Sequence, residues 1–406
     1  MPEPSPHTKA RYRSERIFRA TCFAAIAATG LFLVFLIGSL CIKAYPALWM
    51  HTTELNIQID PDKVDAANAT AGDYPALVKA AIAQEFPDVT ERVPKKKLTQ
   101  LISTGVAETL QRRVTTDPSL VGKTLTIDAP LSANADLFFK GGTGLSDQEA
   151  QWLSQLQQRG KIKAGFAWPL IANGDSRTPE QAGLRGAFVG SLFTIFMTLT
   201  LALPFGVAAA LYLEEFAPKN RFTDFIEVNI NNLAAVPSII FGLLGLAVLL
   251  NIMGLPRSSP LAGGVVLALM VMPTIIIASR AALRAVPPSI REGALGVGAS
   301  KQQAVLHHVL PLALPGILTG TILGIARALG ETAPLLMIGM VAFIADVPSR
   351  ITDAATVLPV QIYLWSSLPE EAFRSRTAAA ILALMLVLLC FNALAIWLRN
   401  RFERRW

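Results

Sequence analysis

Charged residues are scarce in this sequence. Of its 406 residues, only 16% are Asp, Glu, Lys or Arg, whereas 52% are hydrophobic. A soluble globular domain typically carries about 25% charged residues. The deficit argues against a soluble protein and indicates a chain that is embedded in a membrane.

Cysteine and histidine are rare as well, with three and four residues respectively. Cys22, Cys41 and Cys390 lie in or beside apolar runs, and their spacing matches neither a metal site nor a disulfide framework. His307 and His308 are adjacent, so on a helix they point in different directions and form a poor chelating pair. We therefore expect no metal site and no cofactor.

A nucleotide-binding loop is missing too. Gly122-Lys123-Thr124 resembles the end of a P-loop, but Asp117 stands where the first glycine of that pattern belongs. We expect a turn or the start of a strand there. The chain is therefore not expected to be an enzyme, and any ATP-driven process would need a partner ATPase.

Acidic residues are fewer than basic residues, 29 against 36, which gives a formal net charge of +7 at pH 7. Much of the positive excess flanks apolar runs, which favours a membrane-bound protein and argues against a nucleic-acid partner. Six apolar runs are long enough to cross a bilayer as helices of about 20 residues. They lie at residues 20–42, 188–213, 233–250, 261–282, 312–344 and 377–398. The first run is too long for a typical signal peptide and no convincing cleavage site follows it, so we expect a retained span.

Clusters of positive residues give the expected orientation, because such clusters stay on the cytoplasmic side. They lie in the N-terminal tail, in the loop between spans four and five, and in the C-terminal tail: Lys9, Arg11, Arg13, Arg16, Arg19; Arg280, Arg284, Arg291, Lys301; and Arg399, Arg401, Arg404, Arg405. Both termini and this loop are therefore expected in the cytoplasm, with the chain crossing the membrane six times. Arg280, near the end of its span, is expected to snorkel to the membrane surface.

A polar segment separates the first two spans and is expected outside, in the periplasm. Residues 56–60 alternate like a short strand, and residues 77–86, 98–113 and 146–158 have the pattern of helices, the last capped by Ser146. About 140 residues are enough for a small α+β domain. We thus divide the chain into a tail with the first span (1–42), a periplasmic domain (43–182) and a transmembrane domain (183–406).

The loop at residues 285–311 carries a motif. It contains Glu292-Gly293-Ala294, then Gly298, then Leu310-Pro311. Glycine and small residues permit a turn and a close approach to another protein. The motif resembles the EAA loop of ABC importer permeases, although Gly293 replaces the middle alanine and His308 stands at the isoleucine position. The resemblance implies that this loop docks on an ATPase and transmits its movement.

One span contains charged residues far from its start. If a helix begins near Leu312, Arg327 lies about 20 Å along it at 1.5 Å per residue. A charge at such depth costs at least about 2.5–3.5 kcal/mol, and Glu331, one turn on, is expected to neutralise it in part. We expect a polar pathway here, because an arginine fork matches tetrahedral oxyanions. A purely structural ion pair is the alternative. Gly324 and Gly330 would keep the neighbourhood narrow, and Pro334 would bend the helix.

Two longer segments point to one family. Residues 235–243 read A-V-P-S-I-I-F-G-L, and residues 326–336 read A-R-A-L-G-E-T-A-P-L-L. Over about residues 183–398 the sequence resembles the PstA family, the permease subunits of phosphate ABC transporters. The resemblance implies an all-α membrane fold of six helices, here with a periplasmic α+β insert between helices one and two. It also implies four partners: a second permease of PstC type, an ATPase dimer of PstB type, a phosphate-binding protein of PstS type and the lipid bilayer.

Two other functions stay open at this point. The permease could carry another oxyanion, such as molybdate or a phosphonate, through similar pore chemistry. Alternatively, the chain could report phosphate supply to a signalling system without carrying flux. An uptake assay with competing anions would distinguish a phosphate permease from a permease for another oxyanion. A variant that loses uptake but keeps signalling would distinguish transport from sensing.

Overall fold

The computed structural model describes residues 6–89, 91–142 and 144–402. Arg404 and Arg405, which contributed to the expected orientation, lie outside the described residues. Among the described residues, five helices are long and apolar enough to cross a membrane, and a bent pair of helices completes a sixth span if it counts as one. The long helices are α1 (Pro6–Ala44), α8 (Arg185–Leu211), α11 (Pro260–Arg284), α14 (Leu310–Gly330) and α17 (Glu371–Phe402).

Shorter helical segments connect these spans. They are α7 (Trp168–Ala172), η5 (Tyr212–Phe216), α9 (Arg221–Ala234), α10 (Ser238–Leu244), η6 (Gly245–Leu250), α12 (Pro288–Gly296), α13 (Lys301–Ala304), η7 (Val305–Val309), α15 (Ala333–Met337) and α16 (Leu358–Ser366). The segments η5, η6 and η7 are π-helical. Short 3₁₀ turns lie at η1 (Tyr45–Leu48), η2 (Ala66–Ala71), η3 (Pro118–Leu120) and η4 (Pro179–Gln181).

The centre of the bundle is α11, which packs against α8 on one side and α14 on the other. Glycines on α14 make the second contact close. A Cβ on Gly320 would lie 2.2 Å from the Cβ of Ala278, and one on Gly324 would lie 2.5 Å from Cγ1 of Val271. Small residues bring transmembrane helices close enough for extensive van der Waals contact. The expectation that Gly324 narrows its neighbourhood is confirmed, whereas Gly330 has nothing within 4 Å of its position.

The third expected span is bent. Helices α9 and α10 meet at an angle of 103° across Ala235–Pro237, so residues 233–250 do not form the single helix that the hydropathy predicted. The physical reason is Pro237, which lacks an N–H group for the helix and disfavours helical geometry at the residue before it. Pro237 was visible in the sequence and is the signal that could have placed the bend.

The fifth expected span, residues 312–344, is also wrong at its outer end. Helix α14 stops at Gly330, and Glu331 has an extended backbone with φ −80° and ψ 124°. The chain restarts as α15, where Pro334 occupies the first turn. Pro334 therefore does not bend a continuous helix; it stabilises the start of a new one.

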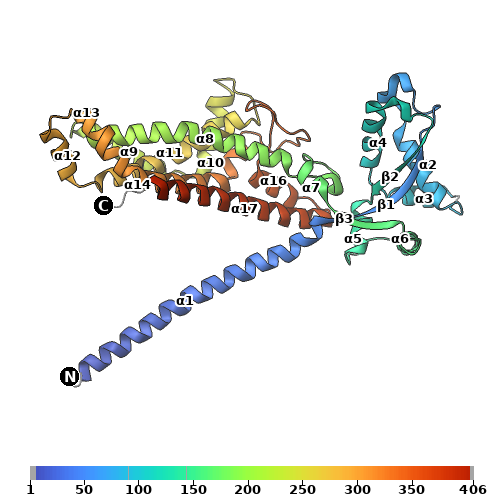
Figure 1. Ribbon diagram of the computed structural model, residues 1–406, viewed down its shortest axis with the longest axis horizontal. Helices are drawn as coiled ribbons and strands as arrows, with labels where there is room; N and C mark the ends of the chain where they lie inside the picture. Colours follow the sequence, from blue (N-terminus) through green and yellow to red (C-terminus); the bar gives the residue numbers. More distant parts are fainter. Residues whose placement is uncertain (1–5, 90, 143, 403–406) are drawn as a thin grey trace.

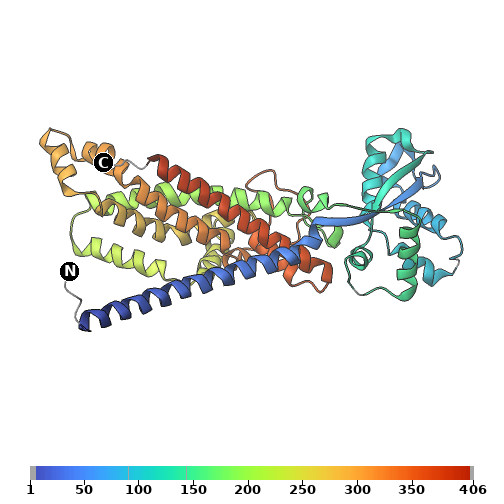
Figure 2. The ribbon, with the colours of Figure 1, turned by 60° about the horizontal axis from the view of Figure 1, so that its bottom comes forward.

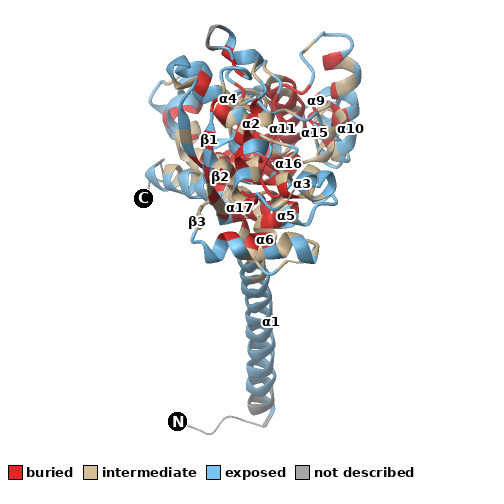
Figure 3. Ribbon diagram, turned by 90° about the vertical axis from the view of Figure 1, so that its right-hand side faces the viewer, coloured by how far each residue is buried: buried red, intermediate tan, exposed pale blue. Residues whose placement is uncertain are grey.

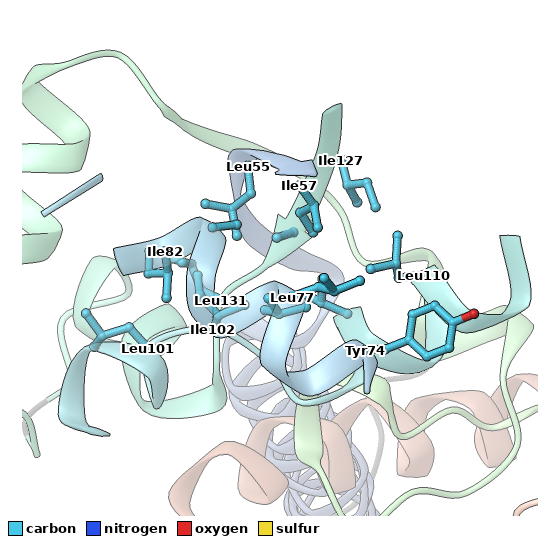
Figure 4. Close-up of a cluster of buried hydrophobic side chains, with 14 of the residues drawn as sticks. Leu55, Ile57, Tyr74, Leu77, Ile82, Leu101, Ile102, Leu110, Ile127 and Leu131 are labelled. Carbon is cyan, nitrogen blue, oxygen red and sulfur yellow. The ribbon is translucent and has the colours of Figure 1, made fainter. Parts of the chain in front are cut away.

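An α+β unit, which we call the insert, follows α1. Strands β1 (Trp49–Gln58), β2 (Thr124–Pro130) and β3 (Ile162–Phe166) form an antiparallel sheet in the order β2-β1-β3. Its helices are α2 (Tyr74–Glu85), α3 (Arg92–Thr99), α4 (Gly105–Thr116), α5 (Ala133–Phe139) and α6 (Asp147–Gln158). Leu55 and Ile57 of β1 pack with Leu77, Ile82 and Leu110 of the helices in a core that contains no residue of the bundle (Figure 4).

Local sequence patterns predicted most of the helices and strands of the insert that we assigned from the sequence. The strand at 56–60 and the helix at 77–86 are confirmed with shifted ends, and Ser146 forms a capping box with Glu149 at the start of α6. The expected helix at 98–113 is confirmed from Gly105 onward as α4, whereas its first part is wrong, because residues 100–104 between α3 and α4 are not helical. Gly122-Lys123-Thr124 forms a turn, with φ +84° at Gly122, that leads into β2.

The insert and the loop at residues 285–311, which we call the coupling loop after its expected role, lie at opposite ends of the molecule. Figure 2 shows the insert at one end, and α12 and α13 at the other, together with the N-terminal end of α1 and the C-terminal end of α17. Helix α1 diverges from the bundle, and its side chains are exposed along most of its length (Figures 1 and 3). Its C-terminal end contacts α17.

A buried charge cluster lies where the insert meets the bundle. The carboxylate of Asp136 on α5 accepts hydrogen bonds from the backbone N–H of His51 (2.9 Å) and from Lys140, and lies 2.8 Å from Nδ1 of His51. Burial alone would raise the pKa of Asp136, but the hydrogen bonds from His51 and the charge of Lys140 hold it below its ordinary value. Asp136 also helps to line a small cavity with Glu180 and Arg376, which belong to η4 and α17.

We expect Asp136→Asn to destabilise this junction by about 3 kcal/mol, because it leaves Lys140 buried without its counter-charge. A carboxylate whose pKa is lowered in the folded state contributes stability above its unfolded pKa of about 3.9, and that contribution is lost as the pH falls below it. Thermal unfolding of the purified chain at neutral pH should show the difference. Asp128→Asn is the matched control, since Asp128 is exposed and 3.4 Å from Lys163. Equal melting temperatures for the two variants would contradict the assigned role of Asp136.

Candidate translocation and coupling site

The two segments that resemble a known family are both interruptions of helices, and they meet in space. Residues 235–243 cover the bend between α9 and α10, and residues 326–336 cover the gap between α14 and α15. Helix α10 packs against α15 so closely that a Cβ on Gly242 would lie 2.6 Å from Cα of Pro334. Non-helical backbone at membrane depth is tolerated where it is buried in protein or lines a polar cavity. In transporters such broken helices form substrate sites.

Arg327 lies in the last turn of α14, just before the gap that separates α14 from α15. It is about 26 Å along α14 from Leu310 at 1.5 Å per residue. Its guanidinium Nε is 3.6 Å from Oε1 of Glu331, and the two side chains are 40% and 21% exposed. A distance of 3.6 Å is too long for a hydrogen bond. The guanidinium therefore retains donors that an anion could use.

The expected geometry of this pair needs a correction. We expected Glu331 one turn further along the same helix, but it is the residue that ends α14. The two side chains still approach each other at i,i+4 spacing, because only ψ of Glu331 leaves helical values and it redirects the chain after this residue. The structure thus brings Arg327 and Glu331 together at the spacing that the sequence suggested, but at the end of the helix.

The coupling loop, residues 285–311, forms two short helices joined by a glycine turn. Helix α12 ends at Gly296, and Gly298 adopts φ +91°, a conformation that favours glycine. Ser300 then caps α13 through a capping box with Gln303. The expected turn at Gly298 is therefore present, between helices at an end of the bundle.

The motif residues divide into an inner and an outer set. Ala294 is buried, and Leu310 and Pro311 are half-buried where the loop rejoins α14. Glu292, Gly293 and Gly298 are exposed, and Val297 between them is 86% exposed. The outer set thus forms the exposed surface of the loop, away from the bundle.

A network of ion pairs, which sequence reasoning missed, anchors this loop to the bundle. Arg291 on α12 donates to Glu215 at 2.6–3.3 Å and to the carbonyl oxygens of Val286 and Leu283. On α11, Arg284 donates to Glu214 at 2.8 Å.

Arg280 belongs to the same network and corrects a second expectation. Only 9% of the residue is exposed, and its guanidinium donates to Glu214 at 3.3 Å and to Glu227. It therefore does not snorkel to the surface as a free cation. The sequence did contain a signal for this ion-pair network. Two adjacent glutamates, Glu214 and Glu215, directly follow the apolar run at residues 188–213, at an end that positive residues flank.

Other candidates acquire no chemical role. His307 and His308 are exposed on η7. Within the part of the chain that the structure describes, no group of three or more His, Cys, Asp or Glu side chains could hold a metal ion.

Comparison with known families decides the class of protein. A family model described as "Binding-protein-dependent transport system inner membrane component" matches residues 202–406, half of the chain. The chain belongs to this family. It is therefore a multi-pass inner membrane protein of the ABC permease class. A second model, "Domain of unknown function (DUF3333)", matches residues 5–149; strand β3, which pairs with β1, lies beyond that match.

Relatives within the permease family narrow the assignment. The phosphate transport system permease protein PstA 1 of Mycobacterium tuberculosis is 32% identical over 56% of this chain and 74% of its own length. PstA of Haemophilus influenzae is 32% identical over 52% of this chain and 74% of its own length. YqgI of Bacillus subtilis, a probable ABC transporter permease protein, is 28% identical over 59% and 85%. The chain is thus a permease of PstA type.

Solved structures of ABC transporters are more distant. A chain of the MetNI methionine ABC transporter in an inward-facing conformation has 19% sequence identity and a TM-score of 0.43, covering 54% of this chain and 96% of its own.

Proposed function

We propose that this permease is a subunit of an ATP-driven phosphate importer and that Arg327 lies on the path of the anion. The observation that supports this most directly is the position of Arg327 in a PstA-type chain, in the last turn before a break in the helix whose continuation, at Pro334, packs on Gly242 of the other interrupted helix. A planar guanidinium with unused donors suits the oxygens of a tetrahedral oxyanion. Glu331, 3.6 Å away, would limit the cost of the positive charge when no anion is present.

The subunit would form the pathway with a second permease of PstC type. The exposed apolar side chains along α9 and α10 support such a partner, for example Phe225, Val228 and Ile239. An ATPase dimer of PstB type would dock on the coupling loop around Glu292 and Val297. A phosphate-binding protein of PstS type would deliver the anion from the other side. Movement of the loop would reach the bundle through the ion pairs of Arg291 with Glu215.

We further propose that the coupling loop and both termini face the cytoplasm and that residues 43–182 form a periplasmic domain. The separation of insert and loop at opposite ends of the molecule supports this orientation (Figure 2). A cysteine introduced at exposed Lys95 should react with a membrane-impermeant maleimide in spheroplasts, whereas one at Val297 should react only in inverted vesicles. The opposite labelling pattern would reverse the orientation.

Uptake of ³²P-phosphate tests the substrate. A strain that lacks this gene and its transport activity should regain phosphate uptake when the complete importer is restored. A large excess of molybdate or of a phosphonate should leave that uptake unchanged. Inhibition by either competitor would favour a permease for that oxyanion, and restored phosphate signalling without uptake would favour a sensor.

A further inference from the structure

A groove of about 710 Å³ opens at the end of the bundle that carries the coupling loop. It lies between the C-terminal ends of α11 and α17 and the first turns of α14. Most of its wall is apolar or small, with Val286, Ile290, Leu312, Pro315 and Gly316 among its residues, and Arg399 of α17 completes it.

Arg399 differs from the arginines that anchor the loop. Arg280, Arg284 and Arg291 all pair with glutamates. Within residues 6–402, the guanidinium of Arg399 hydrogen-bonds only the side-chain oxygen of Asn400, at 3.3 and 3.4 Å. A half-buried guanidinium at the edge of an apolar groove therefore has donors for an anion.

We propose that this groove binds one anionic phospholipid, with its phosphate on Arg399 and an acyl chain along the apolar wall. The surface of α17 beside the groove supports a lipid, because Leu389 and Ile396, on the same side of the helix as Arg399, are exposed and apolar. Trp397, on the opposite face, marks the level of the membrane interface. Tryptophan is enriched where a helix leaves the hydrocarbon region, and basic pockets between transmembrane helices bind acidic head groups.

A purely apolar occupant fits this groove less well. A hydrophobic helix of a neighbouring subunit would cover the wall but would leave Arg399 desolvated without a counter-charge, which is costly. The chain's own α1 runs away from the bundle toward this end (Figure 1). A phospholipid supplies both the negative charge and the apolar chain.

The position of the lipid would connect it to the coupling loop. Pro287, Ser289 and Ile290 line the groove where the loop leaves the bundle, and Pro311 lines it where the loop returns. A bound lipid would thus contact both ends of the loop and bias its angle. This second step rests on the proposed role of the loop in ATPase coupling, whereas lipid binding itself does not.

Native mass spectrometry of the purified chain with added phosphatidylglycerol or phosphatidylethanolamine tests the site. Arg399→Gln should weaken phosphatidylglycerol binding about fivefold, the contribution of one basic residue near an acidic head group, and should weaken phosphatidylethanolamine binding less, because the ammonium group of that lipid offsets the charge of its phosphate. Arg401→Gln is the matched control on the same helix, because Arg401 stacks on Trp397 and does not line the groove; it should bind like the wild type.

Two more measurements exclude other sources of the signal. Ala285→Phe places a ring in the groove from an exposed position and should weaken binding of both lipids. Inorganic phosphate should not displace phosphatidylglycerol, since it lacks the acyl chain. Equal loss in Arg399→Gln and Arg401→Gln, unchanged binding in Ala285→Phe, or displacement by phosphate would each overturn the lipid site. Lipid binding is measured without transport, so its outcome can be interpreted even if the chain is found not to import phosphate.

Discussion

Replacing Arg327 by glutamine should reduce phosphate uptake by roughly tenfold to a hundredfold while the protein remains folded in the membrane. A hydrogen bond to a charged group contributes about 1.5–3 kcal/mol, and 1.4 kcal/mol corresponds to a factor of ten. Loss of the ion pair with Glu331 should cost little stability, because the Nε–Oε1 distance is 3.6 Å and Arg327 is 40% exposed. ³²P uptake and the amount of protein in membranes should be measured on the same cells.

Two further variants separate anion guidance from a structural ion pair. Arg327→Lys keeps the charge but loses the bidentate fork, so it should retain part of the activity. The double change Arg327→Gln with Glu331→Gln removes both charges and should stay inactive. Wild-type uptake in Arg327→Gln, or full recovery in the double variant, would falsify the pathway role and leave only the ion pair.

A bulky residue at Gly298 should uncouple the importer. Gly298 has φ +91°, and a β-branched residue is a strong outlier in that region. Valine in this conformation would cost about 1–2 kcal/mol. Because the turn is exposed, it can avoid that cost by adopting a negative φ, which would change the angle between α12 and α13. We expect Gly298→Val to keep co-purifying a PstB-type ATPase and to lose uptake by about tenfold or more.

Gly293→Ala is the control for that experiment. Gly293 lies inside α12, and nothing is within 4 Å of where its Cβ would be. Alanine favours a helix over glycine by about 1 kcal/mol, so this variant should transport normally. Normal uptake in Gly298→Val, or equal losses in both variants, would remove the hinge assignment.

Hydropathy predicted where the chain is apolar, but it could not predict where the helices break. Residues 233–250 and 312–344 are apolar throughout most of their length, so they pass any length test. The breaks depend on Pro237 and on the extended backbone at Glu331, which hydropathy does not register. In the insert, the start of α6 could be predicted because the cap at Ser146 is a local sequence feature. The gap between α3 and α4 was not predicted.

The candidate site divides in the same way. Arg327, Glu331 and the loop residues could be selected from the sequence because a charge in an apolar run or a spaced glycine is a local feature. The ion pairs of Glu214 and Glu215 could not, because their partners are 66 to 76 residues away. The packing of η5 against α11 brings Glu214 to Arg280 and Arg284, and α12, which follows α11, brings Arg291 to Glu215.

The way the insert is attached limits how the first two membrane helices can move. Helix α1 continues through Tyr45–Leu48 into β1. Strand β3 leads into α7, and the N–H of Arg185 at the start of α8 donates to the carbonyl oxygen of Asn173 at the end of α7 (3.0 Å), across the loop of residues 173–184. Strands β1 and β3 are hydrogen-bonded neighbours, with Trp49 opposite Phe166. The sheet therefore clamps the insert-side ends of α1 and α8 at a fixed spacing. Any swing of α1 relative to the bundle must pivot in the four residues Tyr45–Leu48, so that the far end of α1 travels furthest.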